Sequence, residues 1–408
     1  MASCIRRIVG VVLIAGCLCG RLAAQTHYVG NKVGTWSLND NRHLKELSEL
    51  SAAERSRFEA KTTALISLVH SSKTFSQPMG FDAQAFPRYW TPAECEDEAH
   101  PCVGHPVAFQ MLVYLYAYVL FDEGRVGHSG EPDASAMITV NELTRALGAN
   151  PFGSNANRVL PDGRKILYMP REIPLRVGGY QVYEKPLGQF KHFFLTKRDR
   201  LPWVPVTREQ FLTALIRERE NNFAKQHKDR EPCDQSYKEW MADGDRRRRG
   251  FENMYQEWKK SDPADAERRR ADNEKMEANM PGVLQAAAAS CEASLKKAAA
   301  MEAEQTEALR AELARLTPPE RASQAWYAPG PGPGKSGLVT PTDPQAGALV
   351  ALNPDFFDRS RPRTDFQIIC VEVSSEPEFQ LNKDEVPFWR LEEFLTTTDW
   401  QRVAELLD

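Results

Sequence analysis

Four side chains that could bind a metal or form a disulfide lie within 11 residues: Cys95, His100, Cys102 and His105. Thiolate and imidazole are ligands that tetrahedral zinc prefers, so these four could hold one zinc ion. A disulfide between Cys95 and Cys102 is favoured instead, because the chain begins with an export signal and disulfides persist outside the cytosol. A third possibility is that the four residues have no special role. We therefore expect neither a metal nor a cofactor.

A row of tyrosines, Tyr114, Tyr116 and Tyr118, is the second candidate site. Between Val107 and Phe121 every odd position is apolar, whereas the tyrosines occupy even positions. This alternation, with many β-branched and aromatic residues, predicts a long strand with one face on a core. The tyrosines on the other face would form an amphipathic surface suited to sugars and peptides. The alternative is that helices pack over them and their hydroxyls find partners at the edge.

Motifs of the common catalytic classes are missing from the sequence. It contains no nucleophile elbow, no His-Glu-x-x-His zinc motif and no Cys-x-x-Cys redox pair. Cys370 lies at the centre of an apolar run that predicts a strand, so we expect it to be buried and unreactive. The sequence favours a non-enzymatic binding or interaction protein. The alternative is an extracytoplasmic hydrolase whose acidic residues come together only in the fold.

Cys233 and Cys291 stand at equal distances from a predicted turn. Asp262 lies in a Ser-Asp-Pro sequence, and each cysteine is 29 residues away from it. In an antiparallel helical hairpin, residues equally far from the bend come side by side. We therefore predict a disulfide between these two cysteines. The alternative is that Cys291 fills an alanine-lined seam as a small buried residue.

Residues 1–24 have the order of a secretory signal. Arg6 and Arg7 precede an apolar run from Ile8 to Gly20, and small residues follow. The run is too short for a stable transmembrane helix. We expect a periplasmic or secreted protein of a bacterial envelope. Residues 14–17 also resemble a lipoprotein cleavage box, in which Cys17 would be acylated and anchor the chain to a membrane.

Composition narrows the choice of partners. The 408 residues carry a formal net charge of -4, so no global basic field indicates nucleic acid. No run after the signal reaches 18 apolar residues, so we expect no transmembrane helix in the mature chain. The expected partner is an envelope protein or a polysaccharide.

Residues 25–205 predict an α+β region. Ser51 and Glu54 form a capping box for an amphipathic helix from Ala52 to His70. The proline-rich and acidic stretch from Pro78 to Pro106 predicts a loop. Short connections favour antiparallel pairing of the strands. Beyond the tyrosine-bearing strand, the predicted strands are Ala136–Val140, Lys165–Met169 and Lys191–Thr196.

Residues 206–321 predict helices. Thr207 and Gln210 form a capping box, and Pro232 ends the first helix. A second turn is expected at Asp262, and an interruption at Pro281-Gly282. The following alanine-rich stretch has apolar residues at alternating steps of four and three, which is typical of a coiled coil.

Residues 322–347 form a proline- and glycine-rich linker, and residues 348–408 complete the chain. Strands are predicted at Ala348–Leu352 and Phe366–Val373, followed by a capped helix from Asp399. Two strands cannot form a stable unit alone, so we expect them to return to the N-terminal sheet. The predicted fold class is α+β: an antiparallel sheet domain with a long α-helical, hairpin or coiled-coil-like insertion.

Overall fold

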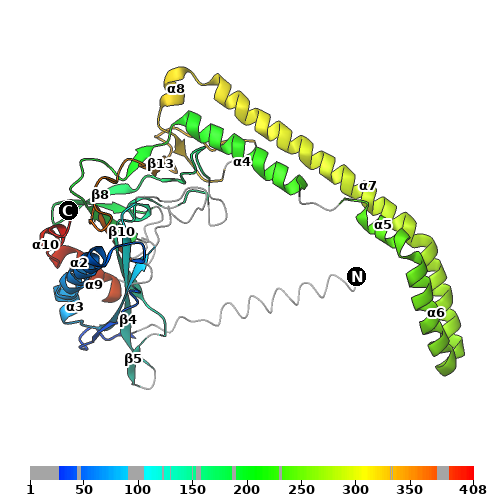
Figure 1. The fold of residues 1–408 in the computed structure, drawn as a ribbon, viewed down its shortest axis with the longest axis horizontal. Coiled ribbons are helices and arrows are strands. Elements are labelled where there is room, and N and C mark those ends of the chain that lie inside the picture. Colours follow the sequence, from blue (N-terminus) through cyan, green and yellow to red (C-terminus); the bar gives the residue numbers. More distant parts are fainter. Residues whose placement is uncertain are drawn as a thin grey trace. The chain divides into compact units, whose positions relative to one another are not determined.

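The computed structural model describes residues 27–43, 47–90, 105–121, 124–128, 130–148, 150–152, 158–185, 190–228, 232–330, 332, 334–374 and 386–408. It divides into two compact units. Unit 1 contains residues up to Pro205 and from Gly347 onward, and unit 2 contains Val206–Ala346. Unit 1 has mixed sheets and helices, and unit 2 is mainly helical (Figure 1). The predicted α+β fold class with a long helical insertion is confirmed.

A large, mostly antiparallel sheet forms the centre of unit 1. Its strands lie in the order β2-β3-β4-β6-β14-β10-β9-β8, and β1 and β5 pair with the end of β4. The C-terminal strand β14 lies between two N-terminal strands, as predicted. Only the short β2–β3 pair is parallel among these described pairings. The strand bounds are β1 His27–Tyr28, β2 Trp36–Leu38, β3 Phe81–Trp90, β4 Ala108–Leu120, β5 Val126–His128, β6 Ala134–Val140, β8 Arg171–Val177, β9 Tyr180–Glu184, β10 Phe190–Leu195 and β14 Ile369–Ser374.

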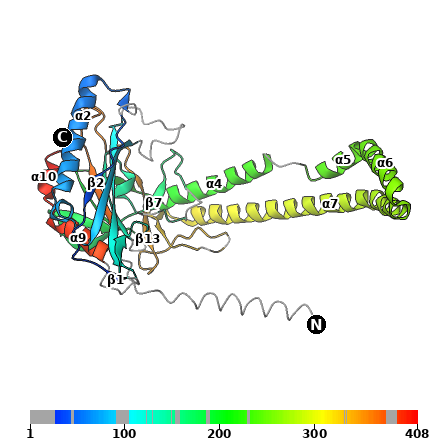
Figure 2. The same cartoon turned by 90° about the horizontal axis from the view of Figure 1, so that it is seen from below.

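Four helices cover one face of this sheet: α2 (Ala52–His70), α3 (Lys73–Ser76), α9 (Val386–Thr397) and α10 (Trp400–Ala404). The predicted capping box of α2 is present, with Ser51 and Glu54 bonded reciprocally. Alternate residues of the strands point into the helix layer and form the main core with its side chains. Figure 2 shows α2, α9 and α10 on one side of the strands. The opposite face is therefore left for other elements.

The prediction of a loop over Pro78–Pro106 is wrong for the part that the structure describes. Residues 81–90 form β3, which pairs with β4 along its whole length. Its inward positions include Ala83 and Ala85, whose small side chains hide the alternation. Pro87 is tolerated because its backbone nitrogen points away from β4, toward the side of β3 on which β2 lies. β2 ends at Leu38, which pairs with Ala85. The missing N–H therefore interrupts no bond to β4.

A smaller sheet of unit 1 contains β7 (Ile166–Tyr168), β13 (Gly347–Leu352) and β11 (Trp203–Pro205), with β13 in the middle. Its side chains form a second core with aromatic residues of the large sheet. Strands β8 and β9 were not predicted individually, and Gly178 and Gly179 form the turn between them. Both glycines have positive φ angles, 57° and 90°, which few other residues adopt readily.

Unit 2 contains an antiparallel helical hairpin. Helices α4 (Arg208–Lys228), α5 (Gln235–Ala242) and α6 (Gly244–Ser261) pack along the long helix α7 (Pro263–Arg315). Asp262 ends α6 and caps α7 by accepting bonds from two amides. The predicted disulfide between Cys233 and Cys291 is present, with Cα atoms 5.7 Å apart. Among the described helices of the protein, none is long and apolar enough to cross a bilayer.

The predicted interruption at Pro281-Gly282 is wrong, because α7 runs through it without a break (Figure 1). A proline inside a helix removes one hydrogen bond and costs about 3 kcal/mol. Here α7 packs against α6 on one side of the proline and against α4 on the other. This packing, with the disulfide at Cys291, holds the helix together through the proline.

Candidate functional site

The candidate site is the part of the large sheet's second face formed by β3, β4 and β6. Directly paired residues point to the same face, and here they include Gln84 with Tyr114 and Asp82 with Tyr116. We call this surface the tyrosine face. It consists of half-buried side chains from three adjacent strands: Gln84, Phe86, Leu112, Tyr114, Tyr116, Ser135 and Met137.

Two of the three predicted tyrosines belong to this surface. Tyr114 and Tyr116 are half-buried, with ring centroids 6.5 Å apart, and Phe86 lies 5.8 Å from Tyr114. The helices of unit 1 pack on the opposite face, so they do not cover these rings. Three aromatic rings thus follow one another across two strands. Polar side chains, Gln84 and Ser135, lie beside them through the strand pairing.

Tyr118 differs from the other two, because it is buried and takes part in a polar cluster. Its hydroxyl donates to Oδ1 of Asp82 over 2.8 Å, and the ammonium of Lys32 lies 3.8 Å from its ring centroid. Burial, together with the Asp82 carboxylate, raises the pKa of Tyr118 to about 12. The phenol therefore stays protonated and continues to donate. Tyr118 positions Asp82 rather than presenting a free ring.

Asp82 also orients an exposed histidine. Its Oδ1 accepts from the amide and hydroxyl of Thr35, and its Oδ2 lies 2.9 Å from Nε2 of His128. The His128 ring packs against Tyr118, with centroids 4.8 Å apart. A carboxylate that is fixed by three donors holds an imidazole in one orientation. This Asp82–His128 pair lies where β3, β4 and β5 meet, beside Tyr116.

Sequence reasoning did not identify Asp82 and His128. They come together because both of their strands pair with β4: Asp82 of β3 pairs with Tyr116, and His128 of β5 pairs with Tyr118. The one available signal was a two-residue alternation from Phe81 to Tyr89, which the alanines and Pro87 weaken; it places Asp82 on the tyrosine-bearing side.

The remainder of the second face, formed by β14, β10 and β9, is closed. We call it the sealed half, and it comprises Tyr183, His192, Phe194, Cys370 and Glu372. Side chains of β11 and β13 cover it, with Trp203 packed edge-on against two of its rings. Cys370 is 2% exposed, as predicted.

Ionisable groups are buried in and beside the sealed half. His192 is fully buried, and its Nε2 lies 3.2 Å from the carbonyl of Ala146. Burial, aided by the nearby ammonium of Lys185, lowers the pKa of His192 to about 4. Lys185 is bonded to Glu372. Burial raises the pKa of Glu142, although Arg145 opposes that effect. These groups are too enclosed to meet a ligand directly.

The predicted disulfide of Cys95 with Cys102, the alternative zinc site with His100, and the lipidation site Cys17 lie outside the described residues. His105 is described, and its ring packs edge-on against Phe357 at 5.3 Å between centroids. Burial lowers the pKa of His105. Within the described ranges, no three His, Cys, Asp or Glu side chains gather closely enough to hold a metal ion.

Comparisons with protein-family models, with curated proteins and with solved structures find no match to this chain.

Proposed function

We propose that the protein is a non-enzymatic binding protein of a bacterial envelope, and that its tyrosine face binds a polysaccharide chain. One observation carries this proposal: three aromatic rings lie beside hydrogen-bonding side chains on the face of the sheet opposite the helices. The export signal predicted in residues 1–24 and the disulfide of unit 2 support a location outside the cytosol.

A saccharide fits this surface because it combines two kinds of group. The C–H faces of a sugar ring pack on aromatic side chains, such as Phe86, Tyr114 and Tyr116. Its hydroxyls bond to amide and hydroxyl groups, such as those of Gln84 and Ser135.

A protein partner fits less well. An extended peptide adds to the edge of a sheet, where backbone donors and acceptors are free. The tyrosine face lies on β3, β4 and β6, and β4 is paired on both sides. A partner helix requires a continuous apolar groove, whereas polar residues interrupt this surface.

The test is co-sedimentation with insoluble envelope polysaccharides, followed by an array of soluble oligosaccharides. Wild-type protein should bind, and the double variant Tyr114→Ala/Tyr116→Ala should lose binding. Trp389→Ala is the matched control, because Trp389 is an exposed aromatic residue on α9, in the helix layer of the opposite face. Equal binding by wild type and the double variant would contradict the proposal, as would binding of unfolded polypeptides in preference to saccharides.

A second function, hydrolysis of an ester carried by the bound chain, is favoured by the Asp82–His128 pair. Asp82 engages Nε2 of His128, and the side chain is 43% exposed, so Nδ1 can serve as a general base for water. His128→Gln should then abolish product release from an acetylated saccharide without weakening binding. If wild-type protein releases no acid from such substrates, the protein only binds.

A further inference from the structure

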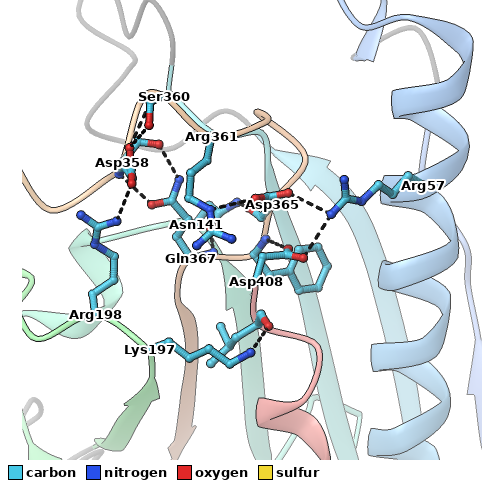
Figure 3. Close-up of polar contacts among 12 residues, drawn as sticks. Arg57, Asn141, Lys197, Arg198, Asp358, Ser360, Arg361, Asp365, Gln367 and Asp408 are labelled. Carbon is cyan, nitrogen blue, oxygen red and sulfur yellow. Dashed lines mark hydrogen bonds and ion pairs between the residues drawn. The ribbon is translucent and has the colours of Figure 1, made fainter.

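A pocket of about 250 Å³ lies in unit 1 at a site unrelated to the tyrosine face. Residues from three distant parts of the chain line it: the loop after β10, the segment between β13 and β14, and the end of the chain. Figure 3 shows many of these side chains converging. The lining residues are Lys197, Arg198, Asp199, Arg200, Arg361, Gln367 and Asp408.

The base of the pocket is held by Gln367, which is 2% exposed. The backbone N–H of Gln367 donates to Asn141 Oδ1 over 2.9 Å. Its side-chain amide accepts from the backbone N–H of Asp358 and donates to the carbonyl of Asp358. Its carbonyl accepts from the hydroxyl of Thr196. Asn141 adopts a positive φ of 58°, a strained conformation that its side-chain bonds support. The pocket therefore has a preorganised floor.

Cations and carboxylates alternate from the pocket lining towards α2. Arg361 pairs with the buried Asp365, which also bonds to Arg57 of α2 (Figure 3). Arg57 reaches Asp408 as well, over 3.2 Å, and Lys61 bonds to the same carboxylate. Burial alone would raise the pKa of Asp408, but its bonds from Lys61 and the Phe366 amide hold that pKa below its usual range. The Asp408 carboxylate therefore stays ionised, and both carboxylates are already paired with cations.

The mouth of the pocket is different, because two of its cations bond to uncharged groups. Lys197 donates to the carbonyl of Leu407, and Arg200 donates to the carbonyl of Asp355 over 3.0 Å. A carbonyl accepts a hydrogen bond without cancelling a full charge. Arg198 pairs with Asp358 over a longer distance, 3.5 Å. Asp199 is the acidic residue of this loop.

Cations outnumber carboxylates in the whole cluster. Lys197, Arg198, Arg200 and Arg361 line the pocket, with Arg57 and Lys61 behind it, against Asp199, Asp358, Asp365 and Asp408. Binding of an anion would offset this excess of positive charge. The pocket is large enough for one small anion and its hydration.

We propose that this pocket binds a phosphate group. Guanidinium forks and a lysine approach from separate segments, which suits a tetrahedral anion whose oxygens point in several directions. A carboxylate needs only one such fork. The same chemistry is offered by free phosphate and by a lipid headgroup. This inference does not depend on the saccharide proposal, since it uses other residues.

The test is isothermal titration of the folded protein with inorganic phosphate at low ionic strength. Wild type should bind saturably, and Lys197→Gln/Arg200→Gln should raise the Kd by about tenfold or more, since a charge-assisted bond contributes at least that factor. Asp199→Asn should lower the Kd, because it removes a repelling carboxylate. That gain of affinity cannot result from misfolding. Lys73→Gln, which removes an exposed cation of α3, is the matched control and should leave the Kd unchanged.

A second arm distinguishes the two sources of phosphate. Co-sedimentation with phosphatidylglycerol vesicles, against phosphatidylcholine vesicles, tests the headgroup. Binding to the anionic vesicles that is lost in Lys197→Gln/Arg200→Gln, with no response to free phosphate, would support the headgroup as ligand. Absence of binding in both arms, tighter binding of malonate than of phosphate, or an equal response to sodium chloride would each overturn the proposal.

Discussion

The two halves of the large sheet's second face differ in how far their side chains are buried. In the sealed half, Trp203 and its neighbours on the small sheet bury Tyr183 and Cys370, and Phe194 packs against them partly buried. On the tyrosine face, Tyr114 and Tyr116 lie on the same sheet but are only half-buried, so part of each ring stays accessible. The sheet is continuous across both halves. The difference in burial therefore arises from the elements that pack on each half.

This contrast separates two uses of aromatic residues. In the sealed half the rings of Tyr183 and Trp203 contribute to stability, because nearly all of their surface is removed from water. On the tyrosine face the rings retain area that a ligand can cover. Replacing an aromatic residue by alanine should therefore affect unfolding in one half and binding in the other.

The largest expected effect comes from opening the sealed half. Trp203→Ala removes a nearly buried ring that packs edge-on against Tyr183 and Phe194. It should lower the free energy of unfolding by about 4 kcal/mol, measured by urea denaturation. Saccharide binding of the folded fraction should persist. A loss below about 1 kcal/mol would show that β11 does not seal this half.

Lowering the pH should destabilise the protein through a buried histidine of the same half. The pKa of His192 is about 4 in the folded chain and about 6.5 when unfolded. As the pH falls from 6.5 towards 4, the unfolded chain takes a proton that the native chain refuses. Stability should therefore fall in this window, by about 3 kcal/mol from this group.

Urea unfolding at several pH values would measure this, with His192→Gln as the comparison. The raised pKa of Glu142 acts in the opposite direction, because protonating Glu142 favours the folded state. The difference between wild type and His192→Gln isolates the histidine. If the variant has the same pH dependence as wild type, His192 is not the group that opens this half.

An intermediate effect on stability should come from the tyrosine face itself. Tyr114→Ala and Tyr116→Ala each remove a half-buried ring, and each should cost about 1–2 kcal/mol, less than Trp203→Ala. Thermal unfolding would check this. A cost as large as that of Trp203→Ala would mean that this surface is also part of a core, and the contrast between the two halves would disappear.

The smallest effect on stability is expected at the border of the tyrosine face. Tyr118→Phe removes the hydroxyl that donates to Asp82 but keeps the buried ring. The free energy of unfolding should fall by about 1 kcal/mol, and His128 should become less ordered. NMR of the His128 ring would report this loss of order, whereas an unchanged spectrum would argue against Tyr118 as a positioning residue.

The elements that could be predicted from the sequence have local signatures. The alternation in β4 is complete, the α2 capping box lies within four residues, and Cys233 and Cys291 are equidistant from Asp262. Where the signature was weak the prediction failed. Alanines and Pro87 concealed β3, and Pro281 suggested a break that tertiary packing overrides.

The sites depend on information that no local pattern contains. Asp82 and His128 meet only because the register of β4 with its neighbours brings them to one end of the sheet. Lys197, Arg361 and Asp408 line one pocket although they are far apart in the chain. Tyr114 could be named as a candidate from sequence, but its exposure depends on where the small sheet stops.

The central claim is that the tyrosine face binds a saccharide, and one titration tests it most directly. An oligosaccharide selected on wild-type protein would be titrated calorimetrically into wild type, Tyr114→Ala/Tyr116→Ala and Trp389→Ala. We predict equal affinity for wild type and Trp389→Ala and no measurable heat for the double variant, with all three proteins folded. Unchanged affinity in the double variant would contradict the claim.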